Sequence, residues 1–158
     1  MVELCPFCPR IDSGDVTRQT AAAVAFGDFH PASRGHTLVV PRRHVASVFG
    51  LDTDEYHELW ELVRAVHDDI SNQLAPAGMN VGINVGPAAG QTVVHAHVHV
   101  IPRYSGDVPD PRGGVRWVLP ERAAYWIRER DDRVGSRRRV SSREHRDHLT
   151  SGRDAELP

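Results

Sequence analysis

Residues 95–101 read His-Ala-His-Val-His-Val-Ile, and this stretch is the most informative part of the chain. Three histidines recur there at every second position, with small or apolar residues between them. Because successive side chains of an extended strand point to opposite faces, His95, His97 and His99 are predicted to share one face. Imidazoles are costly to bury without partners, so three on one face indicate a nucleophile, a proton donor or a metal ligand. The alternatives are a half-buried strand with incidental histidines and a metal-chelating stripe.

The surrounding sequence predicts further strands of an antiparallel sheet. Residues 21–26 and 36–40 are apolar runs, and residues 79–85 alternate in the manner of a strand. A Gly/Pro turn at residues 86–90 then leads into the histidine strand, which is predicted to span residues 93–101. Two strands joined by such a turn are expected to pair antiparallel.

The long predicted helix begins after Asp52. This residue is a suitable N-cap, and Glu55 can reach back to it to complete a capping box. Apolar residues follow at helical spacing along one face: Tyr56, Leu59, Val63, Val66, Ile70 and Leu74. The helix is expected to end near Ala75, before Pro76. We therefore predict an α+β fold, in which an antiparallel sheet of about five strands packs against one long helix and a shorter C-terminal one.

The composition restricts the classes of function. A chain of 158 residues is long enough for one domain with a hydrophobic core. Its formal net charge of −2 implies no general attraction to nucleic acid or to a membrane surface. The sequence has neither an apolar run long enough to span a membrane nor the start of a signal peptide. We therefore expect a cytoplasmic protein with reduced thiols, and neither a membrane nor a nucleic acid as its partner.

The composition changes near the C-terminus. Residues 128–158 are dominated by Arg, Asp, Glu and Ser, and they contain no Phe, Tyr or Trp. Such a segment buries too little apolar surface to fold alone, so we expect a folded domain at residues 1–127 and a flexible charged tail at residues 128–158. The alternative is that the three arginines at residues 137–139 help to attract a polyphosphate or a nucleic acid.

Several separated motifs resemble those of the histidine-triad (HIT) superfamily and occur in the same order. The family pattern is His-φ-His-φ-His-φ-φ, where φ is apolar, and residues 95–101 match it. The Gly-Gln-Thr of residues 90–92 and the Ile-Pro-Arg of residues 101–103 resemble Fhit-like and small bacterial members, as do residues 26–29 and 35–44. The resemblance implies a HIT-like fold, a nucleotide substrate and a homodimer.

The resemblance also implies chemistry at the α-phosphate of a nucleotide. His97 would be the nucleophile and become nucleotidylated, and water would then release a nucleoside monophosphate. His99 would contact the scissile phosphate and the leaving group, and the amide of Gln91 would donate to developing negative charge. Dinucleoside polyphosphates and related nucleotide conjugates are the implied substrates. The alternatives are a phosphorylase, in which phosphate is the acceptor in place of water, and a nucleotide-binding protein with little turnover.

Further positions match the nucleotide-binding residues of the family. Asp28 would accept the two ribose hydroxyls, and Asn84 and Thr92 would bind phosphate or ribose. The walls of an apolar base pocket would be three rings: Phe7, Phe26 and Phe29. The alternative is that Asp28 and Asn84 are turn residues and that the phenylalanines are ordinary core.

The two cysteines form a Cys-x-x-Cys pair at Cys5 and Cys8. The spacing alone is compatible with metal binding, redox chemistry or a disulfide. Bacterial HIT proteins with such an N-terminal pair bind zinc with two further histidines, and the matching positions here are His44 and His95. Two thiolates and two imidazoles make a closed tetrahedral site, so the resemblance implies a structural zinc that ties the N-terminus to the catalytic strand.

Overall fold

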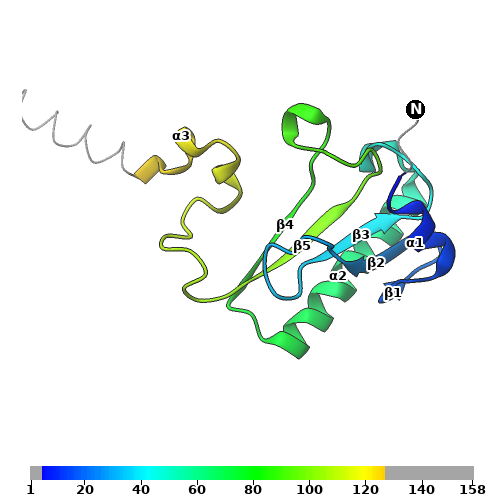
Figure 1. The fold of residues 1–158 in the computed structure, drawn as a ribbon, viewed down its shortest axis with the longest axis horizontal. Coiled ribbons are helices and arrows are strands. Elements are labelled where there is room, and N and C mark those ends of the chain that lie inside the picture. The colour runs from blue at the N-terminus through cyan, green and yellow to red at the C-terminus, as the bar shows by residue number, and fades with distance from the viewer. Residues whose placement is uncertain (1–4, 127–158) are drawn as a thin grey trace, which may run out of the picture. The chain divides into compact units, whose positions relative to one another are not determined.

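The computed structural model describes residues 5–126 of the chain (Figure 1). The chain divides into two compact units, Met1–Pro111 and Arg112–Pro158, and each is described by itself. The tail predicted for residues 128–158 lies outside the described residues, so the division into a domain of residues 1–127 and a tail stays a prediction. Among the described residues, no helix combines the length and the apolar character that a membrane-spanning segment needs.

The first unit is built on one antiparallel sheet with the strand order β1-β2-β3-β5-β4. Its strands are β1 (Arg18–Gln19), β2 (Ala23–Gly27), β3 (Thr37–Pro41), β4 (Gly78–Gly82) and β5 (Val98–Arg103). β3 pairs antiparallel with both β2 and β5, and β4 pairs antiparallel with β5. The α+β class, the five strands and the antiparallel pair around the Gly/Pro turn are thereby confirmed.

The histidine strand is shorter than predicted. β5 begins at Val98, so His95 and His97 precede the strand. The backbone before Val98 is used differently, because the N–H of Ala96 donates to the carbonyl of Val45 (2.7 Å), in the loop after β3. At Ala96 the backbone thus pairs with this loop, and not with a strand of the sheet.

Alternation separates apolar side chains from histidines, as predicted. Ala96, Val98 and Val100 are fully buried in the core on one face of the sheet. The rings of His97 and His99 stand together on the other face, with centroids 4.9 Å apart. The imidazoles therefore lie on one face, and the apolar side chains that pack into the core lie on the other.

Helix α2 (Thr53–Leu74) covers the packing face of the sheet (Figure 1). The predicted capping box is confirmed, because Asp52 accepts the N–H of Glu55 (2.9 Å) and Glu55 accepts the N–H of Asp52 (3.0 Å). The buried helical residues are Leu59, Leu62, Val63, Val66 and Ile70. The helix ends where Ala75 takes a left-handed conformation at φ 44°.

A short helix that the sequence analysis missed lies at the opposite face of the sheet. Helix α1 (Cys8–Ser13) packs Ile11 into a second core, together with Phe7 just before the helix. The strand residues of this second core are Val24, Phe26, Leu38 and Val40. The N-terminal segment is thereby held on the face of the sheet that carries the histidines.

Three short 3₁₀ turns complete the description: Val48–Gly50, Pro87–Ala89 and Gly114–Val118. The last of these belongs to the second unit, as does the short C-terminal helix α3 (Pro120–Ala123). Within this unit the indole of Trp117 donates to the carbonyl of Arg112 (2.8 Å), and the Arg112 guanidinium lies 4.4 Å from the ring centroid of Trp126.

Candidate functional site

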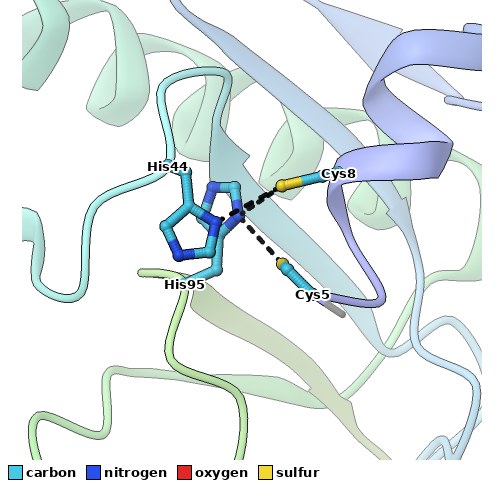
Figure 2. Close-up of side chains that lie close together, drawn as sticks. All are labelled: Cys5, Cys8, His44 and His95. Atoms are coloured by element: carbon cyan, nitrogen blue, oxygen red, sulfur yellow. Dashed lines mark hydrogen bonds between the residues drawn. The ribbon is translucent and has the colours of Figure 1, made fainter. Parts of the chain in front are cut away.

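The four predicted metal ligands lie together, although they come from three separate segments (Figure 2). Cys8 opens α1 and Cys5 precedes this helix, His44 follows β3, and His95 precedes β5. The ligand atoms all lie within 4.8 Å of one another. The Nδ1 atom of His95 is 3.4 Å from Cys5 Sγ and 3.8 Å from Cys8 Sγ, and His44 Nδ1 is 3.3 Å from Cys8 Sγ.

These distances fit a tetrahedral metal ion. With bonds of about 2.3 Å to sulfur and about 2.0–2.1 Å to nitrogen, the sulfur–nitrogen edge of a zinc tetrahedron is about 3.6 Å. The observed edges of 3.3, 3.4 and 3.8 Å lie on both sides of that value. Four protein ligands would also close the coordination sphere and leave no position for a reactive water.

The second ring nitrogen of His95 supports the same interpretation. Nε2 lies 2.9 Å from the carbonyl of Pro41, to which it can only donate a proton. Nδ1 is then free of a proton and points its lone pair at the sulfurs, the arrangement typical of a metal-ligating histidine. Burial lowers the pKa of His95, which keeps the ring in the neutral form that a metal requires.

Neither a disulfide nor redox chemistry is favoured by the cysteines. Both are free thiols in this structure. Burial, followed by the contact with Cys5, raises the pKa of the Cys8 thiol above its usual value. This direction is opposite to the lowered thiol pKa that is typical of redox-active Cys-x-x-Cys pairs, although Cys8 opens a helix. A divalent cation would remove the repulsion between two neighbouring thiolates.

His97 is held in one tautomer by the backbone. Its Nδ1 lies 2.8 Å from the carbonyl of His95, so Nδ1 carries the proton and Nε2 keeps a free lone pair. The ring is buried, and the edge of Phe7 contacts it at a centroid distance of 5.3 Å. His95 thus has two roles. Its ring belongs to the metal cluster, and its carbonyl orients the imidazole of His97.

His36 sets the tautomer of His99 in a similar way. The backbone N–H of Ala32 donates to His36 Nδ1 (3.1 Å), so the proton of a neutral His36 is on Nε2. That proton is donated to His99 Nδ1 (3.0 Å), which leaves His99 with its own proton on Nε2. Burial lowers the pKa of both rings, that of His99 to about 4, so both are neutral at pH 7.

The sequence analysis assigned no role to His36. The signal lies in the sheet register, because Leu38 of β3 pairs with His99 of β5. Alternation places His36 on the same face as Leu38 and therefore diagonally across from His99. This neighbourhood follows from the pairing of β3 with β5, which the amino-acid pattern alone did not specify.

Asp28 lies beside these two histidines. Its Oδ2 is 3.5 Å from His36 Nε2 and 4.0 Å from His99 Nδ1, and its Oδ1 accepts the N–H of His30 (2.8 Å). Asp28, His36 and His99 contain the right atoms for a metal site. However, the contact with Ala32 requires a proton on Nε2 of His36, the atom that would have to bind the metal. We therefore interpret this cluster as a proton network.

The side chain of Gln91 is engaged with the backbone. Its Nε2 donates to the carbonyls of Ala46 (2.8 Å) and Val93 (3.1 Å), and its Oε1 accepts the N–H of Gly86 (2.8 Å). Both amide hydrogens are therefore used within the protein. The role of Gln91 as a donor to phosphate stays a prediction.

The three predicted base-pocket rings lie in different surroundings. Phe7 and Phe26 are buried in the core, whereas Phe29 is 66% exposed. The guanidinium of Arg10 lies 4.3 Å from the ring centroid of Phe26 and 4.7 Å from that of Phe29. In this structure Phe29 thus offers an exposed ring, whereas Phe7 and Phe26 have the environment of core residues.

The remaining predicted nucleotide contacts lie around the turn before the triad. Asn84 is half-buried between β4 and the turn Pro87–Ala89, and Thr92 is exposed directly after Gln91. Their roles in binding stay predictions.

Comparisons with known proteins agree with this geometry. A family model described as the HIT domain matches residues 12–106. An asymmetrical bis(5'-nucleosyl)-tetraphosphatase of Schizosaccharomyces pombe is 39% identical over 89 residues, which are 56% of this chain and 49% of that protein. The adenosine 5'-monophosphoramidase hnt1 of the same yeast is 36% identical over 103 residues, 63% of this chain and 74% of that protein. Among solved structures, a Zn-bound histidine triad family protein from Mycobacterium smegmatis has a TM-score of 0.60 and 30% identity, covering 73% of this chain and 90% of that one.

Proposed function

Because this chain belongs to the HIT family, we propose that it is a nucleotide hydrolase that cleaves at an α-phosphate through a nucleotidyl-histidine intermediate. The observation that carries the proposal is the hydrogen bond from His97 Nδ1 to the carbonyl of His95. It leaves Nε2 of a neutral imidazole as a nucleophile with a fixed direction. Relatives named as a tetraphosphatase and a phosphoramidase support hydrolysis of nucleotide conjugates.

The proposed reaction has two displacements at phosphorus. In the first, the lone pair of His97 Nε2 forms a bond to the α-phosphorus, and the bond from phosphorus to the leaving group breaks. In the second, a water oxygen attacks the same phosphorus, the phosphorus–nitrogen bond breaks, and the water proton passes to solvent. The products are a nucleoside monophosphate and regenerated His97.

His99 would stabilise negative charge in both steps. Its Nε2–H faces away from His36 and is available to a phosphate oxygen. With its pKa lowered to about 4, the free enzyme holds His99 neutral, so it donates a hydrogen bond rather than a full proton. We propose dinucleoside polyphosphates and related nucleotide conjugates as the substrates, in keeping with relatives named as a tetraphosphatase and a phosphoramidase.

The residues around the histidines would hold the nucleoside. Asp28 is proposed to accept the ribose hydroxyls through Oδ2, because Oδ1 already accepts the N–H of His30. The base is proposed to stack on the exposed ring of Phe29. Asn84 and Thr92 would bind phosphate at the turn before the triad.

We further propose that Cys5, Cys8, His44 and His95 hold a structural zinc ion. The sulfur–nitrogen distances and the Pro41 contact of His95 support it, as does the zinc-bound relative. When bound, the metal would neutralise the two thiolates and hold the ring of His95 in place. The His95 carbonyl would then stay aligned with His97. Homodimer formation and a cytoplasmic location stay predictions of the sequence.

The covalent step can be tested by intact-protein mass spectrometry. The zinc-loaded protein is exposed briefly to diadenosine tetraphosphate and quenched in base. We expect a gain of one adenylyl group, absent from His97→Asn. A mass that stays unchanged, with no released adenosine monophosphate, would favour a nucleotide-binding protein instead. Turnover that requires added inorganic phosphate would favour the phosphorylase.

A further inference from the structure

The amide of Gln91 joins three separate pieces of backbone. It accepts a hydrogen bond from Gly86 at the start of the Gly/Pro turn, and it donates to Val93, just before the triad. Its third contact, with the carbonyl of Ala46, crosses to a loop distant in sequence. One side chain thus satisfies three backbone polar groups, and none of its own donor hydrogens is left over.

The loop that Gln91 contacts is the one that carries a metal ligand. Ala46 lies two residues after His44, and Val45 between them accepts the N–H of Ala96 (2.7 Å). The loop is therefore attached to the catalytic segment at two adjacent carbonyls. Of these two attachments, one comes from the backbone and is independent of sequence, and the other requires an amide side chain at residue 91.

We propose that Gln91 is a positioning residue that holds the His44 loop against the catalytic segment and thereby keeps the metal cluster assembled. The proposal rests on the proposed metal centre, and it differs from a role of this amide as a donor to substrate phosphate. A donor to phosphate would affect turnover alone. A positioning residue of the loop affects how firmly the metal is held, even when no nucleotide is present.

Two substitutions remove the contacts in different ways. Gln91→Met keeps the length of the side chain but leaves the carbonyls of Ala46 and Val93 and the N–H of Gly86 without their partner. Gln91→Glu keeps an acceptor for Gly86 but places a carboxylate against the two carbonyl oxygens. Gln73→Met is the matched control, because Gln73 is an exposed amide on α2, outside the metal cluster.

The test is the rate at which the zinc-loaded full chain releases its metal to a chromogenic chelator, without nucleotide. We expect both Gln91 variants to release zinc about tenfold faster than the wild type, the size typical of lost outer contacts at metal sites. Gln73→Met should release it at the wild-type rate. Folded Gln91 variants with the wild-type release rate would overturn the proposal, as would a wild-type chain that binds no zinc.

A second measurement needs no variant. In the wild-type protein, the side-chain amide protons of Gln91 should exchange with solvent far more slowly than those of Gln73, as followed by NMR. Exchange at the same rate for both residues would overturn the proposal. Because neither readout uses a nucleotide, failure of the hydrolase proposal and failure of this one can be told apart.

Discussion

Two clusters of metal-ligand-type residues lie on the same side of this protein, and they differ in what the second ring nitrogen of one histidine in each cluster does. In the metal cluster of Cys5, Cys8, His44 and His95, the far nitrogen of His95 donates to a carbonyl. In the proton cluster of Asp28, His36 and His99, the far nitrogen of His36 accepts from a backbone N–H. The first arrangement exposes a lone pair to a cation, and the second places a proton where a cation would have to bind.

If only the first cluster binds a metal, as we propose, the contacts behind the ligand atoms distinguish the two clusters as well as ligand identity and distance. Both clusters bring His, Cys or Asp atoms within 4.8 Å of one another. They differ in a backbone contact of one histidine in each cluster, that of His95 with Pro41 and that of His36 with Ala32. His97 lies between the clusters, with its tautomer set by the metal side and its ring against His99.

The largest expected effect is at His97, which lies between the two clusters. His97→Asn should lower turnover of diadenosine tetraphosphate by about 10⁴-fold or more, because it removes the proposed nucleophile. Zinc content and the thermal midpoint should stay close to wild type. The check is steady-state kinetics beside metal analysis, and substantial remaining turnover would move the nucleophile to another residue.

Removing a proposed metal ligand should lower the free energy of unfolding of the zinc-loaded protein. A substitution in the proton cluster should leave the zinc bound. Cys8→Ser should lose stoichiometric zinc, and His36→Gln should retain it. Binding to the native state alone adds about 2.7 kcal/mol when free zinc exceeds its dissociation constant 100-fold, and the Cys8 variant forfeits this term. Denaturant unfolding with and without chelator measures it. Equal zinc loss from both variants would contradict the proposal that only the metal cluster binds zinc.

A smaller effect is expected from the partner of His99. His36→Leu removes the donor to His99 Nδ1 and should lower kcat by about tenfold or more, the cost of an unmade buried hydrogen bond. His36→Gln places an amide nitrogen near the position of Nε2 and should restore part of the loss. If both variants had the wild-type kcat, His36 would be a packing residue only.

A pH dependence of stability is also expected from the proton cluster. The pKa of His99 lies at about 4 in the folded protein, below its ordinary value of 6.5. The unfolded chain therefore binds this proton more readily, and the free energy of unfolding falls as the pH drops from about 6.5 towards about 4. Denaturant midpoints measured with chelator across this range should fall less in His99→Gln. Parallel curves for the two proteins would contradict the assignment.

The local features of the fold were predictable because they depend on short stretches of sequence. Asp52 and Glu55 define the start of α2 by their capping hydrogen bonds. The alternation of side chains along β5 correctly placed Val98 in the core and His99 on the opposite face. The predicted start of the histidine strand was wrong, because the backbone of Ala96 bonds to a distant loop. Similarly, β4 ends at Gly82, before the predicted end of that strand.

The site was predictable in part for the same reason. The four predicted metal ligands were assigned from family resemblance, and the structure brings them together. The contact of His36 with His99 and that of Gln91 with Ala46 join positions 63 and 45 residues apart. Such contacts depend on strand register and loop placement, which no pattern of neighbouring residues encodes.

Ring-nitrogen NMR on ¹⁵N-labelled protein at neutral pH would show whether backbone contacts fix the protons of the histidines. We expect His97 to carry its proton on Nδ1, and His99 and His95 to carry theirs on Nε2. A proton on Nε2 of His97 would remove the free lone pair from the proposed nucleophile and contradict the account.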